Sequence, residues 1–147
     1  MKRNIFGYAL IVGLVAVGLQ AFAEEIKREP LTDAAYEALI KDFSRAKDCV
    51  FSQSISNWTA LDRKSLIIYA PTRNRPYYVE LFGISSELKF AHKIGVYSKF
   101  DNRFCGYGGD ALFIEGERMT IRAIKKLDKE TAKQLIEYHK NKKKKKD

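Results

Sequence analysis

Residues 65–82 read SLIIYAPTRNRPYYVELF, and this stretch decides the fold. Two segments rich in β-branched and aromatic residues stand on either side of a loop that is bracketed by prolines. Each proline disfavours helical backbone for the residue before it and so marks the end of an extended segment. The stretch therefore predicts a β-hairpin whose exposed loop carries two cations, Arg73 and Arg75.

Further β-rich segments on both sides of this hairpin extend it into a sheet. A polar loop with Asp101 and Asn102 at its turn, and then the glycine-rich stretch 104–110, separate the later strands. The sequence predicts an antiparallel sheet or small curled β-barrel of about five or six strands. The expected strands are 50–58, 65–70, 77–82, 94–98, 111–114 and 119–124.

Helical patterns precede and follow the predicted strands. The first helix is expected from Thr32 or Asp33 to about Lys47, and the last from its N-cap Asp128 to His139. Each has an apolar stripe at helical spacing. The stripes are Tyr36, Leu39, Ile40 and Phe43 in the first helix, and Ala132, Leu135, Ile136 and His139 in the last. Helices at both ends of an antiparallel sheet make the fold class α+β.

The first residues are expected to be a signal peptide rather than part of the fold. A short basic segment precedes an apolar run, 5–17, and Ala21-Phe22-Ala23 fits the small-x-small pattern of a cleavage site. The alternative is an uncleaved N-terminal anchor. Cleavage after Ala23 leaves one domain, 24–139, and a lysine-rich tail, 140–147, that is expected to be disordered. The localisation predicted is periplasmic or secreted.

The net charge of +9 is a property of the ends of the chain. Lys2 and Arg3 leave with the leader, which lowers the charge to +7. Six lysines and one aspartate in 140–147 contribute +5 of this, so the body contributes only +2. A nucleic-acid reader is expected to have a basic face on its domain, so nucleic acid is not an expected partner. The tail fits a tether to an anionic surface, or an inert solubilising end.

The two cysteines, Cys49 and Cys105, both lie in the part that is expected to be exported. An even number of cysteines in an oxidising compartment favours one disulfide. Such a bridge would stabilise the fold by about 3–5 kcal/mol. The alternative is that Cys105 is a catalytic thiol, which needs a neighbouring base, and nothing adjacent in the sequence marks one.

Six segments, in their order along the chain, resemble an uncharacterised bacterial family of small exported proteins that is classed as a domain of unknown function. The resemblance covers 49–135, and its segments are 49–51, 58–62, 77–81, 88–91, 104–106 and 124–127. The family pattern has two more cysteines, at the places where this chain has Ser85 and Met119. The resemblance implies a fold and an exported location, with Cys49 and Cys105 as the remaining pair, and it implies no reaction.

The sequence contains no recognisable catalytic or metal-binding motif. The glycine-rich stretch lacks the Gly-Lys-Ser/Thr ending of a phosphate-binding loop. The two histidines, His92 and His139, are far apart, so neither a metal nor a cofactor is expected. Four carboxylates in or near the predicted strands are available for acid–base chemistry: Asp62, Glu80, Asp101 and Asp110.

Aromatic residues beside the arginine loop suggest a binding surface. Tyr77 and Tyr78 must face opposite sides of a strand, so one of them is expected on an outer face near Arg73 and Arg75. We therefore predict a non-enzymatic exported protein that binds an envelope partner or an anionic surface. The expected binding residues are Arg73, Arg75, Tyr77, Asp110, Lys142, Lys143 and Lys144. The alternative is a small hydrolase that uses carboxylates near the glycine-rich stretch, and the oligomeric state is left open.

Overall fold

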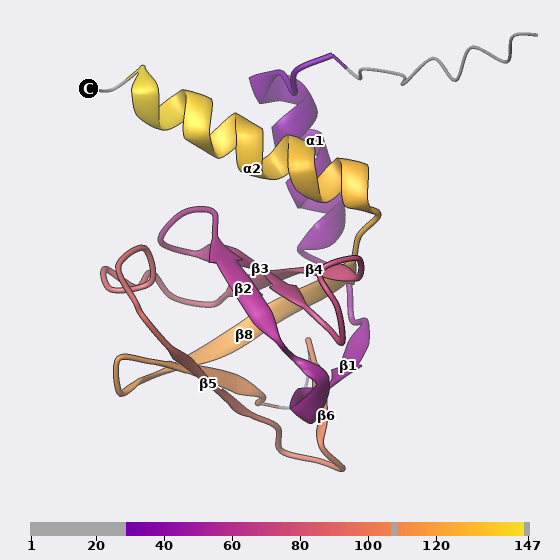
Figure 1. Ribbon diagram of the computed structural model, residues 1–147, viewed down its shortest axis with the longest axis vertical. Coiled ribbons are helices and arrows are strands. Elements are labelled where there is room, and N and C mark those ends of the chain that lie inside the picture. Colours follow the sequence, from indigo (N-terminus) through magenta and orange to yellow (C-terminus); the bar gives the residue numbers. More distant parts are fainter. Residues whose placement is uncertain (1–28, 107–108, 146–147) are drawn as a thin grey trace, which may run out of the picture.

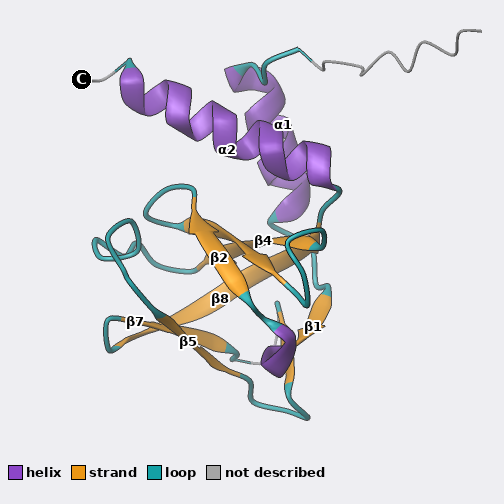
Figure 2. Ribbon diagram, viewed as in Figure 1, coloured by secondary structure: helices purple, strands orange, loops and turns teal. Residues whose placement is uncertain are grey.

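The computed structural model describes residues 29–106 and 109–145, so the predicted leader lies outside the described residues (Figure 1). The fold is α+β, as predicted. A six-stranded antiparallel sheet curls into a half-barrel, and two helices lie together across one side of it (Figure 2). The elements are α1 (Asp33–Phe43), β1 (Cys49–Phe51), a 3-10 helix (Ser52–Ser54), β2 (Asn57–Ala60), β3 (Ser65–Tyr69), β4 (Pro76–Leu81), β5 (Ile94–Tyr97), β6 (Arg103–Cys105), β7 (Ala111–Ile114), β8 (Glu117–Lys126) and α2 (Lys129–Lys144).

The sheet is built around the long strand β8. Its strand order is β2-β3-β4-β8-β7-β5. The first part of β8 pairs with β7 and the second part with β4, and the register shifts at Glu80/Leu81. Such an irregularity increases local twist and bends a strand, which helps the sheet to curl. The predicted hairpin is present as β3 and β4, paired from Ser65 with Glu80 to Tyr69 with Pro76.

The predicted strand 50–58 is wrong, because the chain breaks there into β1, a 3-10 helix and β2. β1 leaves the main sheet to pair with β6, a strand that the sequence did not predict. The polar residues after Phe51 then turn the chain. The Ser52 N–H donates to the Asn102 carbonyl at 2.8 Å, and the Ser54 hydroxyl donates to the Phe51 carbonyl at 2.8 Å. The bond of the Ser54 hydroxyl is a local side-chain bond of the kind that competes with strand pairing.

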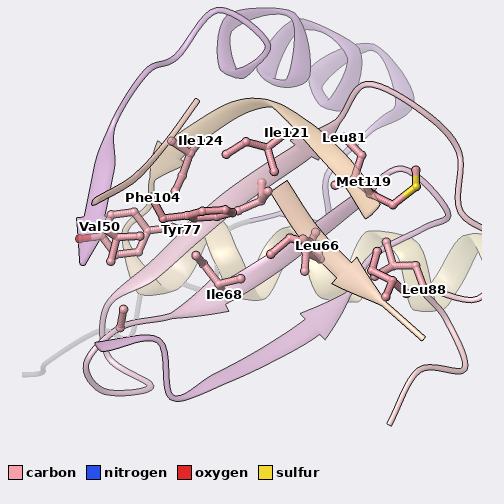
Figure 3. Packing of buried hydrophobic residues seen from close by; sticks show 14 residues of the cluster. Val50, Leu66, Ile68, Tyr77, Leu81, Leu88, Phe104, Met119, Ile121 and Ile124 are labelled. Atoms are coloured by element: carbon pink, nitrogen blue, oxygen red, sulfur yellow. The ribbon is translucent and has the colours of Figure 1, made fainter. Parts of the chain in front are cut away.

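The main hydrophobic core fills the concave side of the half-barrel (Figure 3). Side chains from β3, β4, β7 and β8 meet there, together with Phe104 from β6 and Leu88 from the loop after β4. Most of them, Phe104 and Leu88 included, are fully buried. The core includes Val50, Leu66, Ile68, Tyr77, Val79, Leu81, Leu88, Phe104, Leu112, Ile114, Met119, Ile121 and Ile124.

A second core lies between the convex side of the sheet and the two helices. Its buried members are Phe43, Leu61, Ile67, Tyr78, Leu127, Ala132 and Leu135. All six residues of β4 are buried, because one face meets the main core and the other meets the helices. Tyr77 and Tyr78 do face opposite ways, but both are buried, at 9% and 1% exposed. The prediction that Tyr77 belongs to an exposed binding surface is therefore wrong.

Helix α1 begins at the predicted cap and ends earlier than predicted. The Thr32 hydroxyl accepts from the Ala35 N–H at 3.3 Å, and the helix ends at Phe43 rather than near Lys47. The following residues leave the helix because β8 holds them. The Asp48 N–H donates to the Ile124 carbonyl at 3.0 Å, and the Asp48 carboxylate accepts from the Lys126 N–H at 2.7 Å.

Helix α2 begins as predicted and runs further than predicted. The Asp128 carboxylate accepts from the Thr131 N–H at 2.8 Å, and the helix continues to Lys144. The prediction of a disordered tail is therefore wrong for 140–144. Lysine is a good helix former, and cations in the last turn interact favourably with the helix dipole. Among the described residues, no helix is both long enough and apolar enough to span a membrane.

Candidate functional site

The lysine-rich end of α2 is fixed to α1 by a cluster of aromatic and polar side chains. The rings of Tyr36 and Tyr138 stack with centroids 4.3 Å apart. The Tyr138 hydroxyl donates to the Asp33 carboxylate at 2.7 Å, and the His139 ring packs edge-on against both tyrosines. The sequence stripe included His139 and missed Tyr138, which is buried at 7% exposed. This packing orients the lysines that follow.

Burial sets the protonation states in this cluster. Burial lowers the pKa of His139, and the positive charges of Lys142 and Lys89 act in the same direction, while the charge of Asp62 opposes them. Burial also raises the pKa of Tyr36 well above its ordinary value. His139 Nε2 lies 3.1 Å from the Tyr36 hydroxyl, so a neutral imidazole and a protonated hydroxyl can form a hydrogen bond. The cluster is a packed joint between the helices.

The lysines after this joint lie on folded helix and project from the domain. The Lys142 ammonium donates to the Tyr138 hydroxyl at 3.3 Å and lies 5.4 Å from the centre of its ring. That hydrogen bond raises the pKa of Lys142, so it is charged at neutral pH. Residues 140–145 contain five lysines. Within 29–106 and 109–145 the ion pairs are confined to Glu80 with Lys64 and Arg122, so none neutralises this lysine-rich end.

The arginine loop lies at the other end of α2. Arg73 and Arg75 are exposed, as predicted. Pro76, the first residue of β4 after the loop, accepts through its carbonyl from the Leu127 N–H at 2.9 Å, just before α2 begins. Along the helix, Lys142 lies roughly 20 Å from that point. The structure therefore does not bring the two predicted cationic groups into one patch.

Asp110, a predicted binding residue, is used inside the fold. Its side chain is buried, at 3% exposed. One carboxylate oxygen accepts from the Lys99 N–H at 2.7 Å, and the other accepts from the Cys105 N–H at 2.6 Å. Both oxygens therefore hold backbone around β6, and that Asp110 binds a ligand stays a prediction. The neighbouring Asp101 is exposed at a turn, with a φ of 49°.

Glu80, another of the available carboxylates, is buried between cations. One oxygen lies 3.0 Å from the Lys64 ammonium and 3.7 Å from the Arg122 guanidinium. The other oxygen has no hydrogen-bond partner among the described residues. Two nearby cations compensate the charge of a buried carboxylate, which is what a structural acid requires.

Cys49 and Cys105 form the predicted disulfide. They are register partners in the two-stranded ladder of β1 and β6, with Cα atoms 4.3 Å apart. The bond uses both thiols, so Cys105 is not a free nucleophile in this state. Ser85 and Met119 are both buried, and the Ser85 hydroxyl has no partner among the described residues.

A comparison with protein families places the chain in a family. The model of a family of unknown function, DUF6491, matches residues 1–143. No curated protein and no solved structure matches the chain. The resemblance predicted from the sequence, to a family without a known function, is confirmed; that the protein is bacterial and exported stays a prediction.

Proposed function

Because the chain belongs to DUF6491, a family of unknown function, we propose a function from its own geometry: an exported, non-enzymatic protein that binds an anionic surface through the end of α2. The observation that carries this proposal is the folded lysine-rich end, 140–145. A packed joint holds it, and no ion pair within the described residues neutralises it. A loose tail must lose conformational entropy on binding, and a helix has already lost most of it.

Charge supports the choice of an anionic surface. Each lysine near an anionic membrane contributes about 1 kcal/mol, and salt screens this attraction. The arrangement of the carboxylates supports a non-enzymatic role. Asp110 and Glu80 are held by backbone amides and by cations, respectively, so neither is free to act on a substrate in this arrangement.

The experiment compares two variants of equal net charge. One changes Lys142, Lys143 and Lys144 to Gln, and the control changes Arg73, Arg75 and Lys126 to Gln. All six cations are exposed. Binding to vesicles with anionic phospholipid is measured by co-sedimentation. We expect the lysine variant to bind roughly a hundredfold more weakly than the control.

Equal loss in both variants would mean that net charge alone matters, and it would contradict the proposed site. We also expect binding of the unchanged protein to disappear as salt shortens the screening length from about 10 Å to about 3 Å. Binding that survives this change would contradict an electrostatic mechanism.

A further inference from the structure

The loop 82–93, between β4 and β5, presents apolar side chains to solvent. Phe82, Ile84 and Phe90 are 66%, 69% and 74% exposed. A soluble domain rarely gathers large exposed apolar residues in one short segment without a use for them. The same loop contains two lysines and one glutamate, so it carries a net positive charge.

The loop has a fixed shape despite this exposure. Leu88 is fully buried in the main core. The Ser85 N–H donates to the Arg63 carbonyl at 2.8 Å, and the His92 N–H donates to the Glu115 carboxylate at 3.1 Å. The Phe90 N–H closes a turn onto the Glu87 carbonyl at 2.8 Å. Anchors on both sides therefore hold Ile84 and Phe90 in their exposed positions.

The loop lies at the same end of the molecule as the lysines of α2. Both project to the left in Figure 1, on either side of the turn 61–64. The positive charge of Lys89, from the loop, acts on His139 of α2 and lowers its pKa slightly further. The loop and the lysine-rich end thus combine exposed apolar side chains with clustered cations.

We propose that this end of the protein docks on a phospholipid bilayer with anionic headgroups, and that Ile84 and Phe90 insert into the boundary between headgroups and acyl chains. The inference rests on the proposed function and names its surface. Lysines complement the charge of lipid headgroups, and apolar side chains gain by leaving water for the acyl region. An anionic polysaccharide or an acidic protein region would complement the charge of the lysines, but it would leave the apolar side chains in water.

The first test removes the apolar groups and keeps every charge. The variant Ile84→Ser with Phe90→Ser is compared with a control, Phe51→Ser with Phe100→Ser, whose residues are both 59% exposed and lie at the end of β1 and just before β6. We expect the first variant to bind anionic vesicles about tenfold more weakly and the control to bind unchanged. Because all four side chains are exposed, urea unfolding should show stability within about 0.5 kcal/mol of the original protein.

The second test reports insertion directly. Phe90→Trp and Phe51→Trp each add a tryptophan to the native Trp58. With bromine-labelled acyl chains in the vesicles, we expect the tryptophan fluorescence of Phe90→Trp to be quenched more than that of the original protein. We expect no such additional quenching in Phe51→Trp.

Each outcome decides between the two proposals. If the lysine variant loses binding while the serine variant of the loop does not, the anionic surface stands and insertion into a bilayer is overturned. Quenching that is equal at both tryptophan positions also overturns it. If the unchanged protein does not bind anionic vesicles, both proposals are overturned.

Discussion

Removal of the disulfide between Cys49 and Cys105 should strongly destabilise this domain. The bond closes a loop with a sequence separation of 56 residues. Loop-closure entropy for that length gives about 4 kcal/mol at room temperature. The bond also joins two strands of three residues each, and a two-stranded ladder of this size is marginal by itself. The double variant Cys49→Ala with Cys105→Ala is therefore expected to lose about 4 kcal/mol in free energy of unfolding.

Urea unfolding followed by circular dichroism measures this loss. With a urea slope of about 2 kcal/mol per molar, the midpoint should fall by about 2 M. Reductant should cause a similar fall in the original protein and no change in the double variant. Hydrogen exchange should rise in 49–51 and 103–105 before the rest of the sheet. A midpoint that falls by less than about 0.5 M, in both the variant and the reduced protein, would refute the reasoning.

Three further predictions concern single residues. Gly106→Ala should lower the free energy of unfolding by about 1–3 kcal/mol, because a Cβ there would lie 2.9 Å from a backbone nitrogen of β8. Gly83→Ala should lower it by about 0.5 kcal/mol, because the added Cβ meets only the flexible end of a methionine side chain. Asp110→Ala should destabilise by about 3 kcal/mol, because two buried N–H groups lose their acceptor, and Asp101→Asn should change stability by about 0.5 kcal/mol or less. Equal effects within either pair, measured by urea unfolding, would contradict the packing described. Burial lowers the pKa of His139, so at mildly acidic pH the unfolded chain binds a proton more readily than the folded chain does. The free energy of unfolding should therefore fall as the pH drops from about 7 to about 5. If the free energy of unfolding of a His139→Gln variant falls as steeply over this range, the explanation is contradicted.

The sequence predicted the elements whose signals are local. The stretch 65–82 contains its own strand and turn signals, and β3 and β4 form where they were expected. The caps were predicted as Thr32 or Asp33 and as Asp128, because a short side-chain oxygen at a helix start commonly accepts from free backbone N–H groups, and the structure has Thr32 and Asp128 in that role. The disulfide followed from the presence of only two cysteines.

What the sequence did not predict depends on partners far along the chain. β6 exists because it pairs with β1, more than fifty residues earlier. Tyr77 and Tyr78 are both buried because the main core covers one face of β4 and the helices cover the other, which strand alternation alone does not reveal. Asp110 sits next to a glycine-rich stretch, as many ligand-binding residues do, but the backbone of Lys99 and Cys105 occupies it.

The candidate site was predicted only in part. Lys142, Lys143 and Lys144 were identified by their charge. The signal that they lie on folded helix was overlooked: Tyr138 lies four residues before Lys142, on the same face of the helix. The exposed apolar loop 82–93 has no such local signal, because its phenylalanines look like core residues in the sequence.

Photo-cross-linking in cells tests the central claim most directly. A photoreactive residue at Asn141, in the full-length protein, lies among the lysines of α2 and leaves every charge in place. A second at Asn74, between the two loop arginines, is the matched control. Our account predicts phospholipid adducts from Asn141 and far fewer from Asn74. One specific protein adduct from Asn141, or equal lipid adducts from both positions, would contradict it.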